Sequence, residues 1–174
     1  FWLPGLILAL LAVVLYGNTL NHYFVLDDYS VILENRVTKQ GATAIPEIFK
    51  TSYRYGYYFT NDNLYRPLVK AMFAIEWGIS RDSAFPGHFM NILFYALTAL
   101  VVFFGLKRIT NGNIMLAFIT TALFIAHPVH TEVVANIKSR DEILAFLFSF
   151  MALDQFVAGL RTGNKTNLII APAL

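Results

Sequence analysis

Two adjacent carboxylates, Asp27 and Asp28, follow shortly after the apolar run of residues 2–20. Ionisable groups at the edge of a bilayer are costly and are usually functional. There a carboxylate can accept a proton from a hydroxyl group, whether desolvation raises its pKa or a nearby arginine lowers it. An aspartate before a short helical segment, here residues 29–35, is also a common helix N-cap. We therefore predict that one aspartate reacts and that the other caps the helix.

A second polar group lies in the segment HPVHTEVVANIKSRDE, residues 127–142. Glu132, Asn136 and Arg140 follow one another at four-residue steps, so on a continuous helix they would form one polar stripe. Such a stripe is either a self-contained salt-bridge network or a way to present Arg140 to a phosphate, whose geometry a guanidinium matches.

Histidines recur among these polar residues. His127, His130 and Glu132 have the spacing H-x-x-H-x-E, which is not a common zinc pattern, so we predict no metal site there. His88 and Asn91 lie three residues apart, on one side of a predicted helix. Residues so placed are more often caps or interface residues than ligands.

The segment RPLVKAMFAIEWGI begins with Arg66, and its proline suits the first turn of a helix. We predict a helix here that either lies along the membrane interface or packs against the spans. Arg66 is a candidate for binding a phosphate, although interfacial arginines more often extend to lipid headgroups. The apolar residues at helical spacing are Leu68, Met72, Ile75 and Ile79.

Composition indicates a membrane protein. Of the 174 residues, 57% are hydrophobic and only 14% are charged, with a mean hydropathy of +0.56. These values lie outside the range of soluble globular proteins. The net charge is +2 and no basic cluster is interleaved with aromatic residues, so we exclude nucleic-acid binding. Cysteine is absent, which excludes disulfides and cysteine-bearing metal sites.

Four membrane spans are predicted from the roughly 20 apolar residues that cross about 30 Å of hydrocarbon. The third is short, and it either tilts little or continues through the HPVH turn. The connections 107–113 and 161–166 carry Lys and Arg but no acid, which places them on the cytoplasmic side. The loop 21–88 and the turn 127–142 then share the outer face. The predicted spans are residues 2–20, 89–106, 114–126 and 143–160.

We expect this chain to be a piece of a longer protein, because it begins without Met and stops inside a new apolar run. That run would begin a fifth span near Asn167. The sequon at Asn164 falls on the predicted inner side, so we expect it to carry no glycan. An aromatic run in the outer loop suits headgroup-level packing or a platform for sugar stacking. Its members are Tyr53, Tyr55, Tyr57, Tyr58 and Phe59.

Four segments in order give the sequence a family resemblance. They are NTLNHYFVLDDYSVILEN, YRPLVKAMFAIEWGI, FPGHFMNILFYALTALVVF and AHPVHTEVVANIKSRDEILAFLF. Together, in register on the predicted outer face, they resemble the N-terminal half of the transmembrane O-mannosyltransferases that carry tetratricopeptide repeats, and of their bacterial relatives. The resemblance covers residues 18–153. That family is similar to the wider protein O-mannosyltransferase and GT-C class.

The resemblance implies an all-α polytopic membrane protein, a GT-C-like helical bundle whose large first outer loop contains interfacial helices. It implies transfer of a sugar, typically mannose, from a polyprenyl phosphate to a Ser or Thr hydroxyl of an acceptor protein, with inversion at the anomeric carbon. In that class the acidic residue after the first span is the base, which maps onto Asp27 or Asp28 here. The class has further spans, and these relatives carry a repeat domain, so we expect part of the donor pocket to be missing and this fragment to be inactive alone.

The leaving phosphate of such a reaction needs a cation. Arg140 is the first candidate and Arg66 the second, with hydrogen bonds from His88 or His130. No cofactor is expected, and a divalent cation that bridges the acidic pair and the phosphate is the alternative. Supporting roles are assigned to Asn91, His127, Glu132 and Asn136.

Three other functions compete with this interpretation. A relative in the same superfamily could glycosylate a lipid or a glycan. A transporter would place polar residues at mid-membrane on broken helices, whereas here they gather at the outer ends. A non-catalytic scaffold subunit would tolerate loss of the acidic pair. The favoured location is a bacterial inner membrane, or the endoplasmic reticulum in a eukaryote, with the active site on the outer or lumenal side.

Overall fold

The computed structural model describes residues 2–58, 63–163, 166 and 171. The chain forms two compact units. The first comprises Phe1–Gly17, Ile92–Thr131 and Glu142–Leu174, and the second comprises Asn18–Asn91 and Glu132–Asp141. The described residues form helices and turns, with a single isolated bridge between Tyr55 and Tyr57 in place of any strand. The predicted all-α class is confirmed.

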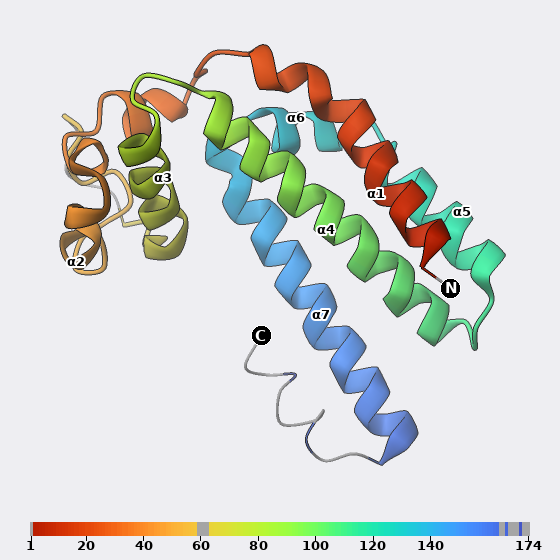
Figure 1. The fold of residues 1–174 in the computed structure, drawn as a ribbon. Coiled ribbons are helices and arrows are strands. Elements are labelled where there is room, and N and C mark those ends of the chain that lie inside the picture. Colours follow the sequence, from red (N-terminus) through yellow and green to blue (C-terminus); the bar gives the residue numbers. More distant parts are fainter. Residues whose placement is uncertain (1, 59–62, 164–165, 167–170, 172–174) are drawn as a thin grey trace. The chain divides into compact units, whose positions relative to one another are not determined.

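The first unit is built from long apolar helices (Figure 1). Helix α1 (Leu3–Tyr16) packs closely on α4 (Phe85–Ile109), because a Cβ at Gly5 would lie 3.3 Å from the side chain of Leu100. Small residues allow this close approach in membranes. Arg108 of α4 and Asp154 of α7 (Arg140–Thr162) form an ion pair with a nitrogen–oxygen distance of 2.9 Å. The unit also contains α5 (Ile114–Ile125). The first residues of α4 and of α7 belong to the second unit.

Three of the described helical stretches are long and apolar enough to cross a membrane: Leu3–Asn21, Phe85–Ile109 and Ile137–Thr162. The sequence predicted a fourth span at 114–126. Helix α5 has 12 residues, which at 1.5 Å per residue gives about 18 Å, well short of the bilayer core. It ends at Ile125 and does not continue through the HPVH turn. The predicted fifth span near Asn167 and the sequon at Asn164 lie outside the described residues.

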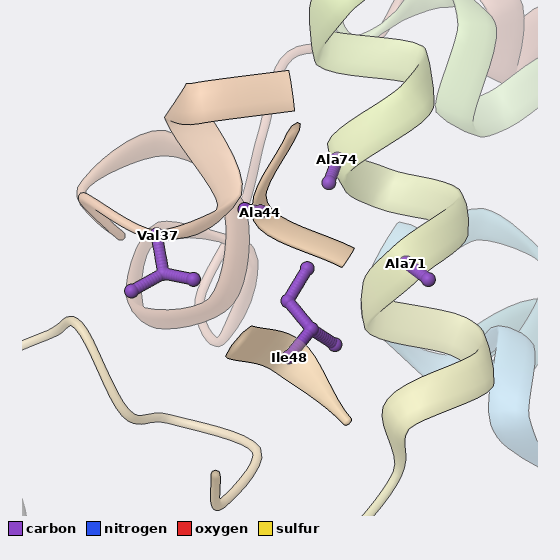
Figure 2. Packing of buried hydrophobic residues seen from close by; sticks show 5 residues of the cluster. All are labelled: Val37, Ala44, Ile48, Ala71 and Ala74. Carbon is purple, nitrogen blue, oxygen red and sulfur yellow. The ribbon is translucent and has the colours of Figure 1, made fainter. Parts of the chain in front are cut away.

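The second unit contains the whole of the predicted outer loop, 21–88, and it has a hydrophobic core of its own. Its elements include a π-helix, η2 (Tyr29–Leu33), a 3₁₀ segment, η3 (Thr38–Ala44), and the helices α2 (Ile45–Ile48) and α3 (Pro67–Ile79). Small and branched side chains let α3 lie close to η3 and α2. The core cluster, shown in Figure 2, is Val37, Ala44, Ile48, Ala71 and Ala74.

Helix α3 packs by the face opposite to its predicted apolar stripe. Phe73 and Trp77 are buried, whereas Leu68, Ile75 and Ile79 are exposed and Met72 is half-buried. Within the second unit this stripe is left uncovered, so its packing against the spans and its position at the membrane interface both stay predictions. The exposed stripe agrees with a helix that lies along the membrane interface.

Candidate active site

A strained turn precedes the two aspartates. Leu26 has a φ of +47°, in the left-handed region that residues other than glycine rarely adopt. The turn is closed by the Asp28 N–H, which donates to the Val25 carbonyl at 2.9 Å. The π-helix η2 follows at once, and both strained turns and π-helical turns are enriched at functional sites. The local backbone therefore marks Asp27 and Asp28 as more than surface acids.

Asp28 connects two distant parts of the second unit. Its side chain is fully buried. One carboxylate oxygen accepts from the backbone N–H of Val25 at 3.0 Å, and the other accepts from the backbone N–H of Lys138, 110 residues away, at 2.8 Å. Burial raises the pKa of Asp28, and these two hydrogen bonds oppose that rise. Asp28 precedes η2, but its side chain makes no capping hydrogen bond, so the predicted capping role is wrong.

Asp28→Asn is expected to destabilise the full-length protein by about 1–3 kcal/mol, because an amide presents one oxygen and one N–H donor to two backbone N–H groups. One of those donors is then left unsatisfied in a buried place. Chemical unfolding in detergent would measure the loss. An unfolding free energy equal to that of the wild type would show that Asp28 does not hold the 132–141 segment.

Asp27 has the opposite environment. Its side chain is 46% exposed, and it lies between two cations. One carboxylate oxygen lies 3.2 Å from Nη2 of Arg54, and the other lies 3.4 Å from Nζ of Lys138. The carboxylate also lines a pocket of about 310 Å³, which is large enough for a small polar ligand. The other lining residues are Leu26, Tyr29, Ser30, Arg54 and Tyr57.

A buried amide fixes the segment that carries Arg54 to the segment that carries Asp27. The side-chain N–H groups of Asn35 donate to the carbonyls of Ser30 and Tyr55, each at 3.1 Å. Nζ of Lys70 donates to the same Tyr55 carbonyl at 2.7 Å. The amide oxygen of Asn35 accepts from the N–H groups of Val37 and Thr38. The pocket wall is therefore held by buried hydrogen bonds, as a preorganised site requires.

Gly56 lies against this amide in a conformation that suits glycine, with a φ of +101°. A Cβ there would lie 2.6 Å from Oδ1 of Asn35. Gly56→Ala is therefore expected to cost about 1–3 kcal/mol of stability and to weaken the pocket. Gly17→Ala is the matched control, since Gly17 has helical dihedrals and open space around it. Equal unfolding midpoints for the two variants would contradict this account.

Arg140 is the centre of a buried polar cluster. Its guanidinium makes a two-pronged ion pair with Glu76 and lies over the ring of Phe73, 4.7 Å from its centroid. Its Nε donates to Oδ1 of Asn91 at 2.9 Å, and Nη2 donates to the carbonyl of Gly87 at 3.0 Å. The side chain is fully buried. The guanidinium is therefore paired with Glu76, and the structure shows no ion pair between Arg140 and Glu132 among the described residues.

The segment 132–140 is not one helix, so the predicted polar stripe is wrong. Helix α6 (His130–Ala135) ends before Asn136, whose backbone is extended, and the 3₁₀ turn η4 (Ile137–Ser139) follows. Glu132 is exposed. The Asn136 carbonyl instead accepts from the side chain of Asn91 at 2.9 Å. The break rotates Lys138 toward the aspartates and Arg140 toward Glu76.

Comparison with known proteins gives three informative relatives. The chain is 32% identical over 151 residues to protein O-mannosyl-transferase TMTC1 of Homo sapiens, a match covering 85% of this chain and 17% of that protein. It is 32% identical over 170 residues to protein O-mannosyl-transferase F38B6.6 of Caenorhabditis elegans, covering 95% and 24%. It is 27% identical over 180 residues to human protein O-mannosyl-transferase TMTC4, covering 95% and 24%. The chain belongs to the TMTC protein O-mannosyl-transferase family.

The resemblance drawn from the four sequence segments is therefore confirmed. The chain spans at most 24% of the length of these TMTC relatives. No family model matches it, and no solved structure matches it.

Two further predicted site residues of this TMTC-family chain, Arg66 and His88, differ in their contacts and burial. Arg66 forms an ion pair with Asp141 and lies over the ring of Tyr53. His88 is buried, with its ring centroid 6.1 Å from that of His22. In the second unit the structure collects Asp27, Asp28, Arg66, His88, Asn91, Glu132, Asn136 and Arg140.

His127 and His130 belong to the first unit. The ring of His130 packs 4.5 Å from that of Phe124 and 5.7 Å from that of Tyr95, between centroids, and burial lowers the pKa of His130. His130 is therefore a half-buried residue packed between aromatic rings. Within the described ranges, no three His, Asp or Glu side chains are grouped closely enough to hold a metal ion.

Sequence reasoning missed the two cations that contact Asp27. Lys138 lies only two residues before Arg140, and Arg54 lies inside the aromatic run that begins at Tyr53. The sequence shows only that Arg54 and Lys138 are basic residues on the predicted outer face, where a basic residue can pair with an acid. Nothing local in the sequence pairs either of them with an acid, because the contacts join residues far apart in the chain.

Proposed function

We propose that this chain is the base-bearing N-terminal part of a protein O-mannosyltransferase that takes mannose from a polyprenyl phosphate. The observation that carries the proposal is the contrast between the two aspartates. Asp27 is half-exposed, held between two cations and part of a pocket wall. Asp28 is buried with both oxygens engaged by backbone N–H groups. Asp27 is therefore the base and Asp28 positions the loops around it.

The reaction follows from what a positioned carboxylate does. The oxygen of a Ser or Thr hydroxyl attacks the anomeric carbon of the mannose, and Asp27 takes the hydroxyl proton. A new carbon–oxygen bond forms on the face opposite the phosphate, and the bond from the anomeric carbon to the phosphate oxygen breaks. The polyprenyl phosphate leaves with that electron pair, and the configuration is inverted. Arg54 and Lys138 hold the carboxylate in one orientation.

The leaving phosphate gains negative charge and is stabilised by a cation. Of the four predicted ligands, Arg140 and His88 are buried, and the ring of His130 packs against Phe124 and Tyr95. The side chain of Arg66 is 33% exposed. Among the described residues it forms an ion pair with Asp141 alone, and a phosphate would have to replace that one carboxylate. Arg66 is therefore our candidate for the phosphate ligand.

The site is proposed to face the outer or lumenal side of the membrane. The connections 107–113 and 161–166 carry Lys and Arg, which favours a cytoplasmic location for the helix ends that they join, on the side opposite the site. The membrane is a bacterial inner membrane, or that of the endoplasmic reticulum in a eukaryote. The acceptor is a protein, by analogy with the relatives' names.

Incubation of the purified full-length protein with labelled polyprenyl phosphate mannose and a serine peptide would test this function. Label is expected on the serine, and the same peptide with alanine at that position is the control. Label found on a lipid or a glycan would overturn the acceptor assignment. Absence of transfer to any acceptor would overturn the enzyme assignment. Repeating the assay with EDTA tests the bridging cation, since undiminished transfer would exclude it.

A further inference from the structure

A second pocket adjoins the one that contains Asp27. Its volume is about 340 Å³, and it is lined by Glu34, Arg36, Gly56, Tyr57 and Tyr58. Tyr57 lines both pockets. The backbone N–H of Arg36 donates to the Gly56 carbonyl at 3.1 Å, so the two walls of the second pocket are tied together. A ligand that reaches Asp27 past Tyr57 would therefore extend into this second pocket.

The second pocket carries two opposite charges that the fold does not use. Glu34 and Arg36 are exposed on either side of the buried Asn35. Among the described residues, neither side chain forms an ion pair or a hydrogen bond. The rings of Tyr57 and Tyr58 lie beside them, with centroids 5.5 Å apart. The hydrogen bonds of buried Asn35 fix the backbone between the two residues, and both exposed charges are available to a ligand.

This combination fits a polypeptide better than an anionic lipid surface. Anionic headgroups attract basic residues and repel a carboxylate, so a headgroup site would not place Glu34 beside Arg36. A peptide can offer a charge of either sign, and aromatic side chains such as tyrosine add contact area at low entropy cost. An extended peptide advances about 3.3–3.6 Å per residue, so residues flanking the reactive hydroxyl would reach past Tyr57.

We propose that the pocket of Glu34, Arg36, Gly56, Tyr57 and Tyr58 binds the acceptor polypeptide next to its reactive Ser or Thr. This deepens the proposed function and rests on it. Arg36 favours an acidic side chain two or three residues from the acceptor hydroxyl, and Glu34 favours a basic one. The pair thereby sets which Ser or Thr residues are glycosylated.

Fluorescence anisotropy would measure binding of labelled serine peptides to the full-length protein, with Asp or Lys placed two or three residues from the serine. Arg36→Glu is expected to weaken binding of the Asp peptides by at least about threefold and to strengthen binding of the Lys peptides. Glu34→Lys should have the opposite effect. Arg81→Glu is the matched control, because Arg81 is an exposed arginine of the same unit that does not line the pocket. Transfer to a peptide without flanking charges should be unchanged in the Arg81→Glu control.

Two results would overturn the inference. One is that both pocket variants keep the wild-type order of peptide affinities while the protein still transfers mannose, in which case only the acceptor pocket is wrong. The other is that Arg36→Glu changes the dependence on anionic lipid in reconstituted vesicles but not the peptide affinities, which would indicate a headgroup site. If the wild type shows the charge preference in binding but transfers no mannose, the peptide site stands and the proposed reaction fails.

Discussion

Replacing Asp27 by asparagine in the full-length protein is expected to lower mannose transfer by about a hundredfold or more. An amide cannot accept the hydroxyl proton, and general-base catalysis contributes a factor of about 10²–10⁴. The folded state should be little affected, because the half-exposed pairs with Arg54 and Lys138 contribute only about 0–1 kcal/mol each. The measurement is the transfer rate at saturating donor and acceptor, together with the unfolding midpoint in detergent.

Asp82→Asn is the matched control for this substitution. Asp82 is an exposed acid of the same unit with a φ of +57°, a conformation that asparagine also tolerates. It should keep both activity and stability. Asp28→Asn should show the reverse of the Asp27 result, a clear loss of stability with residual transfer by the molecules that remain folded. If Asp27→Asn transfers mannose at a rate within a few-fold of the wild type, Asp27 is not the base.

The main helices could be predicted from the sequence because apolar run length is a local property. The runs that predicted spans at 2–20, 89–106 and 143–160 coincide with α1, α4 and α7. The fourth predicted span, 114–126, corresponds to α5, which ends at Ile125 directly before the His-Pro turn and is shorter than the other three. Whether this short helix crosses the membrane stays a prediction.

The division of labour between the aspartates could not be predicted, because two neighbouring acids have the same local sequence. What distinguishes them is the backbone of Lys138, which reaches Asp28 from 110 residues away. The same limit applies to Arg140. Its four-residue steps from Asn136 and Glu132 suggested partners along one helix, yet its partner is Glu76, 64 residues away on α3. The break of the helix at Asn136 removed the periodicity on which the prediction depended.

The buried pair of Arg140 and Glu76 leads to the second large expected effect. Glu76→Ala should lower the unfolding free energy of the full-length protein by about 3–5 kcal/mol, because it leaves a buried guanidinium without its counter-charge. Burial raises the pKa of Glu76, and Arg140 only partly offsets this rise, so the charged carboxylate depends on this one partner. Chemical unfolding in detergent would measure the change.

Two further variants, Glu76→Gln and the double variant Arg140→Met with Glu76→Leu, test whether the unpaired charge causes the loss of stability. Glu76→Gln keeps the shape and one acceptor oxygen but removes the charge, so it should cost less than Glu76→Ala. Arg140→Met combined with Glu76→Leu removes both charges and fills the space, and it should be more stable than either Glu76→Ala or Arg140→Met alone. A double variant no better than the singles would mean that packing on Phe73, and not charge pairing, holds this cluster. The cluster also fixes the segment that delivers Lys138 to both aspartates, so the unstable variants should lose transfer activity although Asp27 is intact.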